Sequence, residues 1–310
     1  MALAVVEFCM AKNYKNIEFF SDKIILRGRL YPSEDFQFSP FIIMTHGTSA
    51  NITMGIDNYA SKFQEAGFNV LLYDHEGMGL SDGEPQVMNP WIQARGYKNA
   101  CKYIKSINHL HNNKIFLWGE SFSGMLVLVV GAFIKNISGI IAVTPSCGID
   151  IINFKNKLID FTKLKDIFSH GNLDNYETDI IGPLPVVSLD QKNIPSLLKP
   201  KSAYNWFKTS SKNSEIKWKN KITRVLPKTE VPFSSQLTAS FIKVPTLIII
   251  GKNDEIEQAN CIVQKHVYDN ISSPKKLIEI DGGHFGCLYP DSAIFLDNLN
   301  NKLNFLNKYK

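Results

Sequence analysis

An apolar run ends in small residues around a serine at Lys114-Ile-Phe-Leu-Trp-Gly-Glu-Ser-Phe-Ser-Gly124. A second apolar segment follows directly, so the pattern predicts a strand that turns sharply into a helix. Such a turn is typical of a nucleophile elbow, which lifts a serine hydroxyl clear of the sheet. The small residues Gly119 and Ser123 let the strand and the helix pass close together, although Ser123 replaces the last glycine of the usual G-x-S-x-G pattern. We therefore predict that Ser121 is a nucleophile.

Short β-branched runs alternate with longer helical patterns on both sides of this turn, which is typical of a mostly parallel sheet with helices on both faces. Strands are predicted at 17–20, 24–31, 41–45, 68–73, 114–118, 139–143, 245–250 and 275–280. Helices are predicted at 59–66, 91–106, 124–134, 255–268 and 292–306. The predicted fold class is α/β, with an antiparallel strand pair at one edge of the sheet.

The alternation is interrupted between residues 148 and 240, where no buried strand is evident and Pro and Lys are frequent. We predict an α/β core of residues 1–147 and 241–310, with a mainly helical lid inserted at 148–240. The insertion holds 14 Lys and Arg against 9 Asp and Glu, and therefore carries all of the formal net charge of +5. A solvated Lys-rich surface explains this charge, and binding of an anionic partner is the alternative.

The composition is that of an ordinary globular protein, with 44% apolar and 20% charged residues in a chain of 310. No long Lys or Arg run indicates nucleic-acid binding. The five cysteines have neither CxxC nor mixed Cys/His spacing, and no HExxH motif occurs, so no metal is expected. Gly77 and Gly79 lack the third glycine of a dinucleotide site, and no cofactor is expected.

Residues 1–10 are apolar, but they include Glu7, lack a cationic segment and are too short for a signal peptide or a spanning helix. Met10 is an alternative start to Met1. No other window has the run of about 18 apolar residues that a membrane helix requires. These features predict a cytoplasmic protein without a membrane span.

A serine hydroxyl becomes a good nucleophile only when a base accepts its proton. His284 lies in the glycine-rich stretch Ile280-Asp-Gly-Gly-His-Phe-Gly286, directly after the last predicted strand. His46 follows a strand and precedes Gly47, which favours a role in shaping the backbone, and the other histidines are expected on the surface or in packing. We therefore predict that His284 is the base.

A carboxylate must hold the imidazole in one tautomer. Asp254 follows the predicted strand in Leu247-Ile-Ile-Ile-Gly-Lys-Asn-Asp254, and the chain order Ser, Asp, His matches a known order for such triads. Asp281 and Glu255 are alternatives, but Asp281 is only three residues from His284, and Glu255 is expected to begin a helix, where a carboxylate favours the dipole. We predict that Asp254 orients His284.

Two backbone amides are predicted to form an oxyanion hole, which stabilises the charge that develops in the transition state. The first is the amide of Phe122, which follows the nucleophile at the start of a helix. The second is the amide of Thr48, in the segment Thr45-His-Gly-Thr-Ser49 that leaves the third predicted strand. Ser49 is the alternative to Thr48.

These motifs resemble the α/β-hydrolase superfamily, from about Ile17 to the end of the chain. The resemblance rests on Thr45-His-Gly47, Phe68-Asn-Val-Leu-Leu-Tyr-Asp74, Gly77-Met-Gly-Leu-Ser81, Asn89-Pro-Trp91 and Trp118-Gly-Glu-Ser-Phe-Ser-Gly124. It points to the dienelactone-hydrolase-like and X-prolyl-peptidase-like branch, which includes esterases, peptidase-like enzymes, and hydrolases and acyltransferases encoded beside polyketide pathways. The resemblance implies a lid, serine chemistry and no metal. One departure is Glu76, which stands where that branch usually has an arginine and reverses a charge near the site.

The leading functional hypothesis is hydrolysis of a carboxylic ester or thioester through an acyl-Ser121 intermediate. An acyltransferase with the same triad, which shields the acyl-enzyme from water, is the first alternative. A catalytically silent binding protein is the second. The expected partner is a small acyl substrate, and an acyl carrier protein or a coenzyme A thioester could be guided by Lys217, Lys219 and Lys221 of the lid.

Overall fold

Eight strands form one sheet in the computed structural model, which describes residues 13–107, 113–290 and 292–310. Their spatial order is β1 (Lys15–Ser21), β2 (Ile24–Tyr31), β4 (Asn69–Tyr73), β3 (Phe41–Thr45), β6 (Ile115–Glu120), β7 (Gly139–Val143), β10 (Thr246–Gly251) and β11 (Lys275–Ile280). β2 is antiparallel to both β1 and β4, whereas the remaining neighbours are parallel. The predicted α/β sheet with an antiparallel edge is therefore confirmed.

The central strands are continuous apolar runs because both of their faces are covered. Every residue of β3, β4, β6, β7 and β10 is buried. The edge strand β1 instead alternates between exposed and buried residues near its end. A sheet buried on both faces is rigid, and the loops at its strand ends are held in place.

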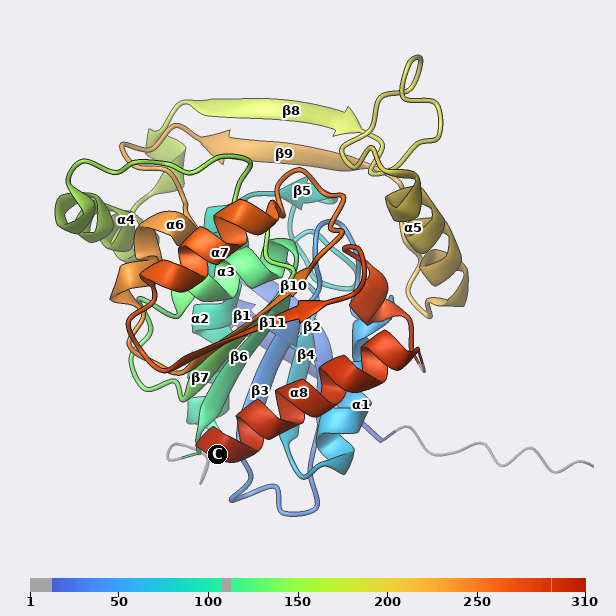
Figure 1. Cartoon of the computed structure of the whole chain (residues 1–310), viewed down its shortest axis with the longest axis vertical. Coiled ribbons are helices and arrows are strands. Elements are labelled where there is room, and N and C mark those ends of the chain that lie inside the picture. The colour runs from blue at the N-terminus through green and yellow to red at the C-terminus, as the bar shows by residue number, and fades with distance from the viewer. Residues whose placement is uncertain (1–12, 108–112, 291) are drawn as a thin grey trace, which may run out of the picture.

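Helices cover both faces of the sheet (Figure 1). α1 (Ile56–Glu65) and α8 (Ala293–Tyr309) pack together on one face. α2 (Pro90–Ser106), α3 (Phe122–Val130) and α7 (Cys261–Asn270) lie on the other. α2 begins where its sequence indicates, because the Asn89 side chain accepts the N–H of Trp91 and Pro90 occupies the first helical position.

One predicted helix begins later than expected. The sequence pattern predicts a start at Glu255, but α7 begins at Cys261, because the side chain of Asn260 caps it by accepting the N–H groups of Ile262 and Val263. Glu255 therefore lies in the loop between β10 and α7 and not in the helix.

The segment 148–240 leaves the sheet after β7 and returns before β10. It contains α4 (Lys157–His170), the 3₁₀ turn η1 (Leu173–Asn175), β8 (Thr178–Leu184), α5 (Lys201–Asn213), β9 (Ile222–Pro227), α6 (Ser235–Thr238) and the start of η2 (Ala239–Phe241). β9 pairs with β8 and with β5 (Val87–Met88), which gives a separate three-stranded sheet above the core (Figure 1). Most residues of β8 are exposed, so no buried-strand pattern marked this sheet in the sequence.

The insertion is anchored to the loop that follows β3. Trp218 donates its Nε1–H to the carbonyl of Ser49 at 2.8 Å, and the Asn51 side chain donates to the carbonyl of Ile216 at 3.1 Å. Trp206 of α5 also stacks on Phe285, the residue after His284, with ring centroids 5.1 Å apart. The insertion therefore contacts the two core loops that carry Thr48 and His284.

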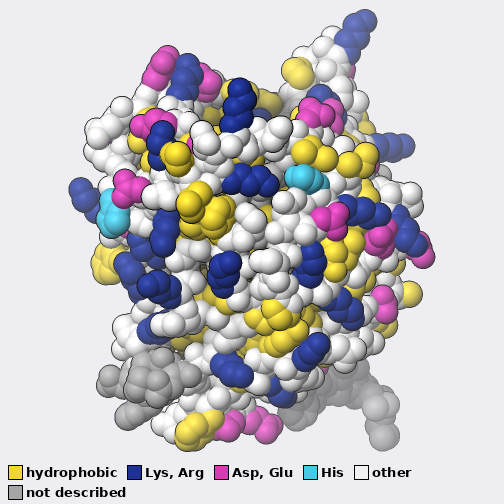
Figure 2. All heavy atoms as spheres, turned by 60° about the vertical axis from the view of Figure 1, so that its left-hand side comes forward, with side chains coloured by type: hydrophobic (Ala, Val, Ile, Leu, Met, Phe, Trp, Pro, Cys, Tyr) yellow, Lys and Arg dark blue, Asp and Glu magenta, His cyan; other side chains and the backbone are white. Residues whose placement is uncertain are grey.

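Lys and Arg side chains are scattered over the face drawn in Figure 2, with acidic and apolar side chains between them. Within the described ranges, none of the helices combines the length and the apolar character that a bilayer span needs. The alternative start at Met10 and the predictions for residues 1–10 lie outside the described residues.

Candidate active site

Ser121 sits on a strained turn between β6 and α3. Its φ of 55° is positive, a value that residues other than glycine rarely adopt, and its ψ is −116°. The strand and helix are so close that a Cβ on Gly119 would lie 2.2 Å from the carbonyl oxygen of Ser123. This geometry is that of the predicted nucleophile elbow, and glycine is required at 119.

Ser123, which replaces the usual glycine, is more than a small residue. Its hydroxyl donates to the carbonyl of His46 and lies 2.7 Å from Nε2 of His75. His46 itself is buried, with Nδ1 2.8 Å from the carbonyl oxygen of Gly47. Ser123 therefore ties the elbow to the loop after β3, and His46 shapes that loop as its sequence context indicated.

The structure brings Ser121, His284 and Asp254 together. Nε2 of His284 lies 2.8 Å from Oγ of Ser121, and Nδ1 lies 2.8 Å from Oδ2 of Asp254. The Asp254 side chain is only 1% exposed, and His284 is 3% exposed. Burial opposes protonation of His284, but the hydrogen bond and charge of Asp254, with the charges of Glu120 and Glu255, raise its pKa above the usual value.

The two alternative carboxylates lie elsewhere. Asp281 is exposed and pairs with Lys252 at 2.7 Å. Glu255 accepts the backbone N–H of His284 at 2.9 Å through Oε2, so it holds the loop and not the ring. Asp254 is thus the carboxylate that contacts the imidazole.

Both predicted oxyanion residues, Thr48 and Phe122, line the same cavity as Ser121. Neither amide N–H has a hydrogen-bond acceptor among the described residues, so both are available to a ligand. Ser49, the alternative to Thr48, lines a different hollow together with Lys217 and Lys219.

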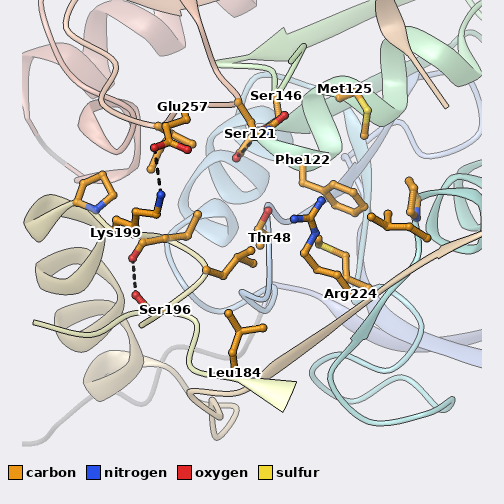
Figure 3. A pocket seen from close by; sticks show the side chains of 18 of the residues that line it. Thr48, Ser121, Phe122, Met125, Ser146, Leu184, Ser196, Lys199, Arg224 and Glu257 are labelled. Atoms are coloured by element: carbon orange, nitrogen blue, oxygen red, sulfur yellow. Dashed lines mark hydrogen bonds and ion pairs between the residues drawn. The ribbon is translucent and has the colours of Figure 1, made fainter. Parts of the chain in front are cut away.

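The cavity above Ser121 has a volume of about 490 Å³ and is roofed by the insertion. Figure 3 shows Ser121, Thr48 and Phe122 on the core side, with Leu184 and Arg224 reaching in from β8 and β9. Apolar side chains form most of the remaining wall: Met88, Pro90, Met125, Leu197, Leu198, Pro200, Leu226, Phe233 and Ile256. Glu76, the departure from the usual arginine, does not line this cavity.

Three residues at or near the site were missed in the sequence. Ser146 has its Oγ 3.4 Å from Oγ of Ser121, and it lies in the loop after β7, where no motif marks it. Arg224 comes from the insertion, whose strands the sequence pattern did not reveal. Glu120 could have been found, because it is the one acidic residue in the otherwise apolar strand before Ser121.

Glu120 is buried beside His284, with its Oε1 3.7 Å from Nε2 of the imidazole. Burial raises the pKa of Glu120 to about 7. A Cβ on Gly47 would lie 2.4 Å from Oε2 of Glu120, so a larger residue at 47 would have to displace this carboxyl group. No group of His, Cys, Asp and Glu side chains suited to a metal ion occurs in the part of the chain that the structure describes.

Comparison with known proteins finds similarity to one family model and to several fungal enzymes. Residues 39–179 match the family model described as serine aminopeptidase, S33. A polyketide transferase, grgF of Penicillium sp, is 36% identical over 132 residues, which cover 42% of this chain and 44% of that protein. The acyltransferase drtE of Aspergillus calidoustus is 25% identical over 289 residues, which cover 89% of both chains.

Solved structures show the same fold. The crystal structure of the α/β hydrolase GrgF from Penicillium sp. sh18 superposes with a TM-score of 0.71 at 24% identity and covers 96% of this chain and 98% of that one. The structure of DcsB in complex with its substrate analogue has a TM-score of 0.70 at 22% identity, over 96% of this chain and 99% of that one. The resemblance indicated by the sequence motifs is confirmed at the level of the fold: the chain has the α/β-hydrolase fold, and the family model matches residues 39–179 of it.

Proposed function

We propose that this chain is a serine enzyme that cleaves a carboxylic ester or thioester through an acyl-Ser121 intermediate. The observation that carries the proposal is the continuous hydrogen-bonded series from Ser121 through His284 to Asp254, with both contacts at 2.8 Å, at the floor of a cavity. Two matches support acyl chemistry at this site. The match to the polyketide transferase grgF spans less than half of that protein, and the match to the acyltransferase drtE is nearly full-length.

In the proposed reaction, Oγ of Ser121 attacks the acyl carbonyl while Nε2 of His284 takes its proton. The amides of Phe122 and Thr48 donate to the oxyanion, and Asp254 stabilises the imidazolium that forms. The imidazolium then protonates the departing alcohol or thiol, which leaves the acyl group on Ser121. The second half of the reaction repeats these steps with a new nucleophile.

The identity of that nucleophile separates hydrolysis from acyl transfer. We propose segment 148–240 as a lid over the residues of the core, 1–147 and 241–310. Apolar residues of this lid and its neighbours wall the cavity, and an apolar wall that limits water favours an alcohol or amine as acceptor. Transfer is therefore the second candidate function, and relatives named as transferases support it.

The test is labelling with a fluorophosphonate probe, read by intact mass, for the native chain and for Ser121→Ala. We expect one adduct on the native chain and none on Ser121→Ala, with Ser146→Ala as the matched control that still labels. Absence of an adduct on the native chain would leave the silent binding protein as the better account. Turnover of a thioester in the presence and absence of an added alcohol then distinguishes the acid product of hydrolysis from a transfer product.

A further inference from the structure

Four charged side chains line the cavity above Ser121: Lys199, Arg224, Glu255 and Glu257. Three of them have a local partner. Lys199 pairs with Glu257 at 3.3 Å, and Glu255 accepts the backbone N–H of His284. Arg224 makes neither a hydrogen bond nor an ion pair with any described residue, and its Nε atom is shielded from solvent. Arg224 is therefore the positive charge of the cavity that has no direct counter-charge among the described residues.

The backbone of the insertion aims Arg224 into the cavity. Arg224 and Leu226 are two residues apart on β9, so their side chains emerge on the same face of that strand, and both line the cavity. Arg224 is also paired in register with Met88 of β5, a third residue of the same wall. Figure 3 shows the Arg224 side chain pointing into the cavity, whereas the paired Lys199 and Glu257 lie on the opposite side.

A partly buried, unpaired guanidinium is unfavourable in the empty protein, because it has lost water without gaining a counter-charge. That loss is recovered when an anion enters the cavity. The planar guanidinium presents two parallel N–H donors, which match the two oxygens of a carboxylate. Methylene groups between that carboxylate and the reacting carbonyl would contact Met88, Met125 and Leu226, all of which line the cavity.

We propose that Arg224 binds a carboxylate carried by the acyl part of the substrate, so that the preferred acyl group is the half-ester or half-thioester of a dicarboxylic acid. This inference rests on the proposed acyl chemistry of Ser121 and adds the substrate class. Arg224 is a specificity-determining residue here and takes no part in the proton transfers.

The kinetic test compares two esters with the same leaving group, p-nitrophenyl hexanoate and the mono-p-nitrophenyl ester of adipic acid. For Arg224→Gln we expect the ratio of kcat/KM for the carboxylate ester to that for the neutral ester to fall about 10- to 100-fold, mainly through KM. Arg224→Lys should lie between, because the charge remains and the fork is lost. Lys212→Gln is the matched control, since it removes one exposed charge from the same insertion and lines no part of the cavity.

A second pair of substrates tests the leaving group. Hexanoyl coenzyme A and hexanoyl-N-acetylcysteamine share the acyl group and the thioester, but only the coenzyme A leaving group carries phosphates. A loss in Arg224→Gln that is confined to the coenzyme A thioester would assign the anion to the leaving group and overturn the proposal. An unchanged ratio for the two esters, or an equal loss for both of them, would overturn it as well.

Binding separates this inference from the proposed chemistry. Calorimetry on Ser121→Ala measures the affinity for monomethyl adipate and for methyl hexanoate, with no turnover required. We expect the carboxylate to bind more tightly by about 10-fold or more, and the double variant Ser121→Ala/Arg224→Gln to lose that difference. If the native chain neither labels nor turns over esters while this difference persists, the proposed chemistry fails and the carboxylate site stands.

Discussion

Oε1 of Glu120 lies 3.7 Å from Nε2 of His284, and both side chains are buried. Glu120 belongs to the strand that delivers Ser121, so the residue before the proposed nucleophile also contacts the proposed base. Burial raises the pKa of Glu120 to about 7, which leaves the carboxyl group partly ionised near neutral pH. Its negative charge favours the imidazolium and is one cause of the raised pKa of His284.

The first prediction concerns the pH dependence of turnover in Glu120→Gln. The proposed base must be neutral to accept the serine proton, so kcat/KM falls as the pH drops through the pKa of His284. Removal of the Glu120 charge lowers that pKa, and the acid limb should therefore move to lower pH. A pH profile of kcat/KM on a neutral ester measures the shift.

Glu257→Gln is the control for this measurement, because Glu257 lines the same cavity but is exposed and paired with Lys199. Its acid limb should coincide with that of the native chain. A limb that stays in place in Glu120→Gln, or that moves to higher pH, contradicts an influence of Glu120 on His284.

The second prediction compares two aspartates near the base. Asp254→Asn removes the acceptor that holds Nδ1–H, so turnover should fall by several orders of magnitude, about 10⁴-fold for comparable triads. Asp281→Asn should change turnover by less than about threefold, because Asp281 is exposed and pairs with Lys252. Steady-state kinetics of both variants, with circular dichroism to verify the fold, gives the answer. Greater damage from the Asp281 change would assign the orienting carboxylate differently.

The sequence could predict Ser121, Asp254 and His284 because each follows directly after a strand of the main sheet. β6, β10 and β11 are parallel, so the loops at their carboxyl ends meet at one edge of the sheet. An apolar run followed by small or charged residues marks the ends of β6 and β10, and a glycine-rich stretch marks the end of β11. Strand register then determines which loops are close together.

Features set by tertiary contact could not be predicted in the same way. β8 is a strand because it pairs with β9, but its largely exposed residues carry no apolar pattern. Ser146 and Arg224 reach the cavity from segments without a motif, so only their positions in space reveal them. The sequence pattern predicts that Glu255 begins a helix, yet the cap at Asn260 starts that helix later, and Glu255 binds the backbone N–H of His284.

The third prediction concerns stability and the buried lysine of α8. Lys302 is fully buried, its Nζ lies 3.6 Å from the centroid of the Tyr59 ring, and it has no hydrogen-bond partner among the described residues. Burial lowers the pKa of Lys302 to about 7, whereas in the unfolded chain it is near 10.5. Between these values the unfolded state binds more protons, so the free energy of unfolding rises with pH.

Lys302→Met removes that proton uptake while it keeps the shape of an unbranched side chain. Through this group, the free energy of unfolding of the native chain should rise by about 2 kcal/mol between pH 7 and pH 9, and Lys302→Met should lack that rise. Urea unfolding at the two pH values measures it, and Lys308→Met at the end of the same helix is the control. Equal pH dependence in the native chain and Lys302→Met would show that Lys302 keeps its ordinary pKa.

The last prediction concerns the lysines of the insertion and an anionic acyl carrier. Lys217, Lys219 and Lys221 are exposed, and the first two line a hollow of about 160 Å³ beside Gly77 and Gly79, apart from the cavity of Ser121. Exposed charges accelerate encounter with an oppositely charged partner, and salt screens them over roughly 10 Å at 0.1 M. Replacement of all three by Gln should therefore lower kcat/KM for a coenzyme A or carrier-protein thioester about three- to tenfold at low salt, and less at high salt. A neutral short-chain ester should be unaffected in both conditions. An identical response of both substrates at every salt concentration would assign these lysines to the solvated surface, because electrostatic steering would affect only the anionic substrate.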